Sequence, residues 1–429
     1  MKRLTIALTA LYVLFPLSDF IIRRILGLGG IAGLWDKGLL LLLFLLAWMQ
    51  ADKDRIRQLH PLLTPLGLFA ALGVLHLVID LPNFAAGFDG FRAVFYYALA
   101  LFVGAWALKG LDDVTRILRI IVAVGIFAAV FGIGQVLLGV ETPASWTDAA
   151  EKTTRRAFSF VVSPNVLGSY MAFVIPLTAG LGLIARREGK RAAFALYGGA
   201  IMLELAALFL SGSRGAWFAF FIAALAVLFI ERPRWSALGA VLLGGAMIAL
   251  PPIKRRLTAL FSPTYWEKSA TDGRIARWLG SYHQMRFDPL FGRGIGHYGG
   301  ATGNRFFGTT YVDSYFFKTL AEMGLPGLIL FLWLVIAVLQ TLFHLWRRRA
   351  GNAEGTVSAA LFTAVLGVIL HNTVENIFEV PFMNAYVWLA VGMAFALTPP
   401  GEKPADHPST ATIGSAVDRS FGTVGGENG

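Results

Sequence analysis

Four arginines stand next to apolar segments, where a charged side chain is costly. Arg156 occurs in RAFSFVVSPNVLG, Arg214 lies in the short turn SGSRGAW, and Arg274 and Arg277 occur in TDGRIARW. A guanidinium group presents a planar fork of donors that matches phosphate oxygens. The four arginines are therefore candidate pyrophosphate ligands, and we expect them to converge at the outer face of a membrane.

Candidate proton acceptors occur in two further segments. Asp313 precedes an apolar run in VDSYFFKTLAEMGLPGL, while His371 and Glu375 are separated by three residues in HNTVENIFE. The second spacing predicts one face of a helix. Carboxylate or imidazole bases beside arginines suit transfer from a pyrophosphate leaving group. For each single residue, a polar helix end satisfied by water or a neighbour is an equally good interpretation.

Other patterns carry less weight. Gly294, Gly296 and Gly299 spell G-x-G-x-x-G, but no strand and helix flank them as in a nucleotide site, so a flexible turn is favoured. The Asp52-Lys53-Asp54 triplet lies among basic residues and indicates a solvated face. The histidines show no paired ligand spacing, and the absence of cysteine removes thiolate chemistry. We therefore expect no metal and no cofactor.

The composition indicates that the helices carrying these residues lie in a membrane. Of 429 residues, 56% are hydrophobic and 15% are charged, and the mean hydropathy is +0.64. Soluble domains carry about a quarter charged residues. The sequence therefore predicts an all-α polytopic membrane protein.

Windowed hydropathy predicts about 12 transmembrane helices. The expected spans lie near residues 4–20, 34–50, 62–80, 91–108, 117–138, 164–185, 193–210, 215–230, 236–252, 325–345, 355–372 and 381–398. The first has a basic start but no A-x-A cleavage site, so we interpret it as an uncleaved span rather than a removed signal.

The connectors after every second span are rich in lysine and arginine, which predicts that they and both termini are cytoplasmic. Residues 1–398 then form the transmembrane body, and residues 399–429, rich in Gly, Pro, Ser and Thr, form a disordered cytoplasmic tail. The long connector 252–312 faces the outside.

This connector has a surplus of positive charge. Nine lysines and arginines between Lys254 and Arg305 oppose three acidic residues, which indicates an anionic partner. Membrane lipid head groups and a polyphosphate ligand both fit. Within the connector, Thr271 or Asp272 is expected to cap a helix over 273–287. Its apolar arc should lie in the membrane surface while its arginines face phosphates.

Six motifs in order resemble the bacterial O-antigen ligase and O-antigen polymerase superfamily, over roughly residues 155–379. They are RAFSFVVSPN, SGSRGAW, TDGRIARW, FDPLFGRGIG, VDSYFFKTLAEMGLPGL and HNTVENIFE. The resemblance implies inverting, metal-independent glycosyl transfer on the periplasmic face of the bacterial inner membrane. The implied donor is an undecaprenyl-pyrophosphate-linked glycan, and the acceptor hydroxyl belongs to lipid A core or a polysaccharide. Arg214 and Arg274 match the family's phosphate-binding arginines.

One departure keeps ligase and polymerase both open. Many ligases of the family carry a His-Asn pair before the tenth span, where this chain has Asp313-Ser314. Asp313, or else His371 with Glu375, would then be the base. Membrane lipids and a chain-length regulator are further expected partners, and nucleic acid is not. A transporter or flippase, and a peptidoglycan polymerase, are the alternative classes.

Overall fold

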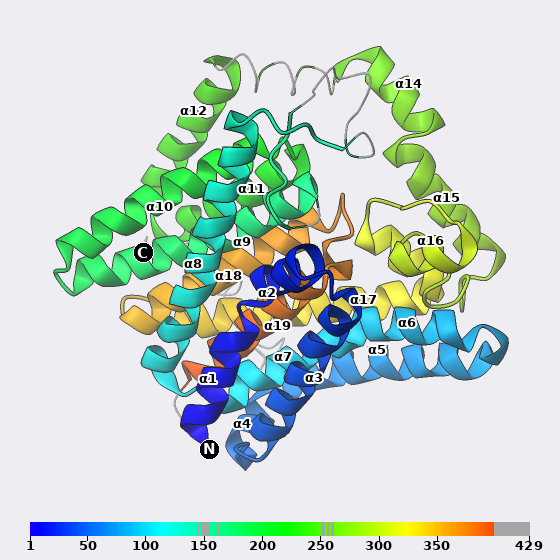
Figure 1. Ribbon diagram of the computed structural model, residues 1–429, viewed down its shortest axis with the longest axis horizontal. Helices are drawn as coiled ribbons and strands as arrows, with labels where there is room; N and C mark the ends of the chain where they lie inside the picture. The colour runs from blue at the N-terminus through cyan, green and yellow to red at the C-terminus, as the bar shows by residue number, and fades with distance from the viewer. Residues whose placement is uncertain are drawn as a thin grey trace, which may run out of the picture.

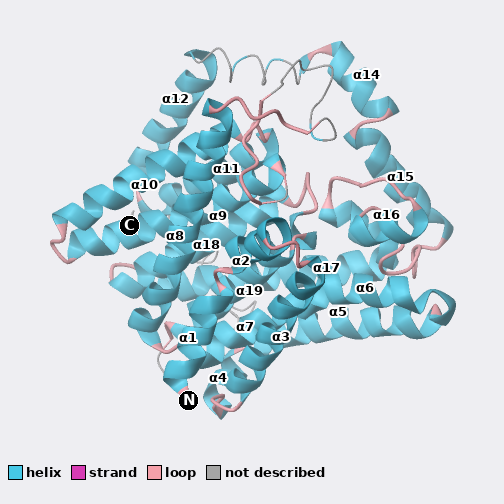
Figure 2. Cartoon of the chain, viewed as in Figure 1, coloured by secondary structure: helices cyan, strands magenta, loops and turns pink. Residues whose placement is uncertain are grey.

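The computed structural model describes residues 1–143, 146, 155–161, 163–249, 254, 258 and 261–398. Every regular element in this part of the chain is a helix, and none is a strand (Figure 2). The predicted all-α class is confirmed. The predicted disordered tail, 399–429, lies outside the described residues.

Nine helical stretches in the described part are long and apolar enough to cross a bilayer. They are α3 (Gly29–Trp48), α5 (His60–Ile79), the stretch Leu81–Ala107, α8 (Gly110–Leu137), α9 (Pro164–Arg187), α10 (Arg191–Leu210), α11 (Arg214–Glu231), α17 (Tyr315–Arg348) and α18 (Ala353–His371). The stretch Leu81–Ala107 comprises η2 (Leu81–Asn83), α6 (Phe84–Phe95), η3 (Tyr96–Ala98), α7 (Leu99–Phe102) and η4 (Val103–Ala107). The chain is thus a multi-pass membrane protein.

The predicted count of about 12 spans is not established. At the N-terminus, α1 (Lys2–Tyr12) and the segment Phe15–Ile25, made of α2 (Phe15–Phe20) and η1 (Ile21–Ile25), form a pair bent by 54° that would be a tenth span. Helices α12 (Pro233–Ala249) and α19 (Pro381–Ala396) have 17 and 16 residues. Both are shorter than the roughly 20 residues that a span needs.

Helices α9, α18 and α19 lie at the centre of the bundle (Figure 1). In the most apolar window of α9, 89% of the residues are buried, against 22% in α10. Small residues allow this close packing, as they do in membrane helix pairs generally. A Cβ added at Gly180 of α9 would lie 2.8 Å from the Ala360 Cβ of α18. The core of the protein is therefore built on α9 and α18.

The basic connectors meet at one end of the bundle. Arg187, which ends α9, donates from Nη1 to the Gly351 carbonyl before α18 at 3.1 Å. Trp346 near the end of α17 donates to Glu231, the last residue of α11, at 2.9 Å. The ends of four helices are joined here, so their other ends must gather at the opposite side of the bundle.

Three short helices lie in the described part of the connector between α12 and α17. They are α14 (Pro263–Thr271), α15 (Arg274–Phe287) and α16 (Ala301–Phe307), and they line the right side of the view in Figure 1. Helix α15 packs on α17 through Trp278, whose ring stacks on Phe317 with centroids 5.3 Å apart. The connector is thus attached to the helical body.

Two expectations about α15 are wrong. Neither Thr271 nor Asp272 caps it; the N-cap is Gly273, and the nearest side-chain support is Ser269, which accepts from the Ile275 amide at 3.4 Å. The reason is that Thr271 and Asp272 end α14, where the Thr271 hydroxyl donates to carbonyls of its own helix. The apolar arc is also divided: Met285 is buried, and Trp278 packs on α17, while Leu279 and Tyr282 remain exposed.

Candidate active site

The segments that carry the predicted site residues meet at the end of the bundle opposite the basic connectors. The Ala157 amide donates to the Leu210 carbonyl at 2.9 Å, which joins the segment before α9 to the end of α10. The Tyr315 amide at the start of α17 donates to the carbonyls of Asn372 (2.9 Å) and Glu375 (3.2 Å), just after α18. Tertiary packing thus gathers four helix ends.

Arg156 is bonded to protein groups on several sides. Its Nε donates to the Ser211 carbonyl at 2.8 Å, and its Nη1 donates to the Trp146 carbonyl at 2.9 Å. Its Nη2 donates to Oδ1 of Asn165 at 2.9 Å, and Asn165 donates in turn to the Glu375 carboxylate. These bonds engage all three nitrogens of the guanidinium group. Arg156 therefore holds Glu375 in place through Asn165, and its contact with pyrophosphate stays a prediction.

Two carboxylates face the same small region. Asp313 forms an ion pair with Arg277 of α15, with Oδ2 2.6 Å from Nη1. Burial raises the pKa of Glu375 to about 7; the Asp313 charge acts in the same direction, and Arg274 and the bond from Asn165 oppose it. A carboxylate with such a raised pKa can accept a proton near neutral pH. The pair therefore has the electrostatics of a general base.

Arg274, the first residue of α15, has a donor without a partner. Its Nε is buried and makes no hydrogen bond to the part of the chain that the structure describes. Its charge acts on both His371 and Glu375. A buried donor left unpaired costs free energy, so native structures rarely keep one without a role. The position suits an oxygen of an anionic ligand.

His371 lies behind this region rather than in it. Its side chain is buried, with Nε2 3.4 Å from the Ser213 Oγ. A Cβ added at Gly215 would lie 3.0 Å from the imidazole, so the start of α11 closes over the ring. The expected helical pairing of His371 with Glu375 is wrong, because α18 ends at His371 and Glu375 lies in the turn that follows.

Arg214 is the first residue of α11. Ser213 caps this helix by accepting from the Ala216 amide at 3.4 Å. The Arg214 guanidinium carbon lies 5.4 Å from the centre of the Tyr265 ring in α14, which is a cation-π distance. The N-terminus of a helix favours negative charge. Arg214 thus adds a side-chain charge at the positive end of α11.

The backbone at Asp313 is unusual. Its φ is 52°, in the left-handed region that residues with a Cβ seldom adopt. Such strain persists where the surroundings fix the chain, and it is concentrated at functional sites. The residue that departs from the family motif is therefore held in a specific orientation. We call Arg214, Arg274, Arg277, Asp313 and Glu375 the arginine cluster.

Asn165 was not predicted, although a local signal exists. In S-P-N the Ser163 side chain caps α9, accepting from the Val166 amide at 3.3 Å, with Pro164 as the first helical residue. This arrangement is a common helix start. It places Asn165 at the first turn, facing the site. The partner, Glu375, is 210 residues away, so no local pattern identifies the contact.

The glycine run at 294–300 is packed rather than free. A Cβ added at Gly296 would lie 2.4 Å from the Ala86 carbonyl oxygen, and one added at Gly90 of α6 would lie 2.5 Å from the Gly296 Cα. Ile295 is buried in the core. The expected turn is present, and it packs against α6, where the glycines permit the close approach of the connector.

Comparison with known proteins supports a family assignment. Residues 199–332 match the O-antigen ligase family. The matched range runs from within α10 to within α17, so it includes Arg214, the connector and Asp313. No curated protein matches the sequence significantly. The match confirms the resemblance to the O-antigen ligase and polymerase superfamily.

Proposed function

We propose that this multi-pass membrane protein of the O-antigen ligase and polymerase superfamily is a glycosyltransferase of the bacterial inner membrane. It transfers glycan from undecaprenyl pyrophosphate to an acceptor hydroxyl on the periplasmic face. The observation that carries the proposal is the unpaired buried Nε of Arg274 beside the carboxylates Asp313 and Glu375. A guanidinium group with an unpaired donor and a carboxylate that can accept a proton are the two groups this transfer requires.

In the proposed reaction, the acceptor oxygen bonds to the anomeric carbon as the bond from that carbon to the pyrophosphate oxygen breaks. Attack opposite the leaving group inverts the anomeric configuration. Arg214 and Arg274 stabilise the charge that develops on undecaprenyl pyrophosphate. Guanidinium groups supply the positive charge, so the scheme uses no cofactor and no metal.

The hydroxyl proton passes to the carboxylate pair. Asp313 is the member that meets the acceptor, because its side chain keeps 23% of its exposure, whereas Glu375 is bonded to Asn165 behind it. Burial raises the pKa of the neighbouring Glu375 to about 7, so a proton is held readily beside Asp313 near neutral pH. His371, enclosed by Ser213 and Gly215, orients the turn that carries Glu375 and does not contact the acceptor.

Reconstitution tests the proposal. Purified protein in liposomes, given undecaprenyl-pyrophosphate-linked glycan and an acceptor, should yield transferred glycan and free undecaprenyl pyrophosphate. Release of the lipid without transfer, or movement of intact lipid-linked glycan across the bilayer, would contradict it; the second outcome would identify a flippase.

The lipid-linked glycans of a deletion strain separate the two subclasses. A lost ligase leaves long lipid-linked polymer, because assembly continues without transfer to lipid A core. A lost polymerase leaves single repeat units. Either pattern assigns the acceptor class that Asp313, in place of the family's histidine, leaves open.

Sidedness has its own test. Reporter fusions after Lys268 and Arg305 should report an exterior location, and fusions after Arg191 and Arg349 a cytoplasmic one. The opposite signs would place the arginine cluster in the wrong compartment and would overturn the proposal.

A further inference from the structure

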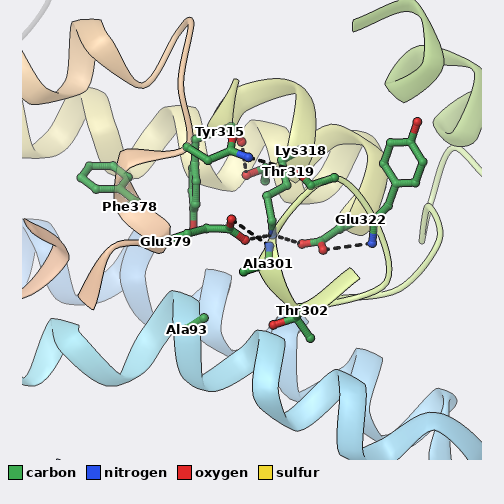
Figure 3. A network of polar contacts seen from close by, with 12 residues as sticks. Ala93, Ala301, Thr302, Tyr315, Lys318, Thr319, Glu322, Phe378 and Glu379 are labelled. Atoms are coloured by element: carbon green, nitrogen blue, oxygen red, sulfur yellow. Dashed lines mark hydrogen bonds and ion pairs between the residues drawn. The ribbon is translucent and has the colours of Figure 1, made fainter. Parts of the chain in front are cut away.

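A second charged group lies beside the arginine cluster, and the proposed reaction does not use it. Lys318 of α17 lies between the carboxylates of Glu322, one helical turn further, and Glu379 of η8 (Ile377–Glu379) (Figure 3). Its Nζ pairs closely with Glu322 and lies 3.5 Å from Glu379 Oε1. Lys318 and Glu322 are both buried. We call these three residues the lysine anchor.

The lysine anchor holds the connector by its backbone. Glu322 Oε1 accepts from the Tyr298 amide at 3.3 Å, and Glu379 Oε2 accepts from the Ala301 amide at 3.1 Å. A Cβ added at Gly300 would lie 1.9 Å from Glu379 Oε1 and 2.5 Å from Lys318 Cε. The connector therefore lies directly against the lysine anchor, and a larger residue at position 300 would displace the Glu379 and Lys318 side chains.

The held segment in turn fixes the neighbour of Asp313. The Gly299 carbonyl accepts from the Val312 amide at 2.9 Å and from Asn376 Nδ2 at 2.9 Å. Val312 is buried, and Asp313 follows it in the left-handed conformation. A continuous path of hydrogen bonds thus joins the lysine anchor to the backbone of the proposed base.

We propose that the lysine anchor positions Asp313 within the arginine cluster. Lys318, Glu322 and Glu379 are positioning residues: they act through 298–301 and Val312 and do not touch substrate. The inference rests on the proposed function of Asp313. Misplacement of a reacting group by about 1 Å can cost a hundredfold in rate, so release of this segment should lower turnover more than donor binding.

A pair of substitutions at Glu379 tests the inference. Glu379→Ala removes the acceptor of the Ala301 amide, and kcat should fall about ten- to a hundredfold while KM for the lipid-linked donor changes little. Glu379→Gln keeps an acceptor oxygen for the same amide and should restore most of the lost turnover. Glu188→Ala is the matched control, because Glu188 is an exposed glutamate paired with Lys190 near the basic connectors; it should leave turnover unchanged.

Hydrogen exchange supplies a readout that needs no substrate. In Glu379→Ala, the amides of Ala301 and Val312 should exchange faster, while amides within α9 should be unaffected. Unchanged exchange at Val312 would overturn the inference, and so would faster exchange with unchanged kcat. Equal loss of turnover in Glu379→Gln and Glu379→Ala would also overturn it, since charge rather than positioning would then matter. Absence of transfer by the wild-type protein would count against the proposed function, and the exchange result would still decide whether the lysine anchor fixes Val312.

Discussion

The arginine cluster and the lysine anchor lie next to each other and use the same chemical groups in different ways. In the arginine cluster, Arg277 pairs with Asp313 and the Arg274 charge acts on Glu375, while Arg214 lies against the Tyr265 ring; the Arg277 and Asp313 side chains are 35% and 23% exposed. In the lysine anchor, two carboxylates share one ammonium group and two backbone amides, and the Lys318 and Glu322 side chains keep 5% and 2%.

The difference supports the proposal that the arginine cluster, rather than the lysine anchor, binds the anionic ligand. Buried charges are stable only when they are paired and hydrogen-bonded, as they are in the lysine anchor. The unpaired buried donor of Arg274 instead suits an oxygen of an anion that arrives from outside. Variants of the first cluster should therefore change rate, and variants of the second should change stability or positioning.

The largest effect is expected for Asp313→Asn. The amide keeps the shape but cannot accept the hydroxyl proton, so kcat should fall by about a hundred- to ten-thousandfold. Transfer would be measured at equal amounts of inserted protein. Glu354→Gln, a carboxylate in the first turn of α18 near the basic connectors, serves as the control. Turnover near that of the wild type would remove Asp313 from the role of base.

Arg274→Ala should lower the rate about a hundred- to a thousandfold, because one preorganised donor to the leaving group is lost. Arg274→Lys keeps the charge without the planar fork and should recover only part of the rate. Arg214 should show the same order, alanine below lysine. The measurement is release of undecaprenyl pyrophosphate per enzyme. If lysine restored full activity at both positions, the positive charge alone would account for the effect of Arg214 and Arg274 on the rate, and the planar guanidinium group would not be needed.

Lys318→Met should act on folding. It leaves the buried Glu322 and the partly buried Glu379 without their cation, and loss of the partner of a buried charge typically costs about 3–5 kcal/mol. The yield of folded protein and the midpoint of thermal unfolding in detergent would both fall. Adding Glu322→Gln and Glu379→Gln should recover much of the stability, because the uncompensated charges are then absent. A stable single variant would show that the lysine anchor has no structural importance.

The pH dependence is a smaller effect that separates the two carboxylates. A base works when deprotonated, so turnover should be present above a pH of about 7 and be lost as the pH falls through the raised pKa of Glu375. In Glu375→Gln the carboxyl group with the raised pKa is absent, so the loss of turnover on acidification should occur at a lower pH. If wild type and Glu375→Gln lost turnover at the same pH in pH–rate profiles, protonation of Glu375 would not control the rate.

Metal removal should have no effect. Among the described residues, no three histidine, aspartate or glutamate side chains are grouped to hold a metal ion, and the proposed scheme assigns the leaving-group charge to guanidinium groups. Transfer rates with and without a chelator should agree. A strict requirement for added divalent metal would transfer the stabilising role from the arginine cluster to that ion.

The sequence by itself determined the membrane class and the helical class, and it marked most members of the arginine cluster as candidate site residues. Hydropathy over about 20 residues is a local property, so each predicted span corresponds to a helix or a helical stretch even where its length falls short of a crossing. Arg214, Arg274 and Asp313 were identifiable because a charge at the end of an apolar run is costly and so stands out.

Only the tertiary structure decided which charged residues act together. Asn165 donates a hydrogen bond to Glu375, which is 210 residues away in the sequence, and Lys318 of α17 pairs with Glu379 of η8, which follows α18. The i,i+4 spacing of His371 and Glu375 indicated a shared helix face. Helix α18 instead ends at His371, which is buried, and Glu375 lies in the turn that follows. Local spacing describes neighbours within one helix, whereas pairing and burial of a charge depend on which helix ends pack together, and that is set by the whole bundle.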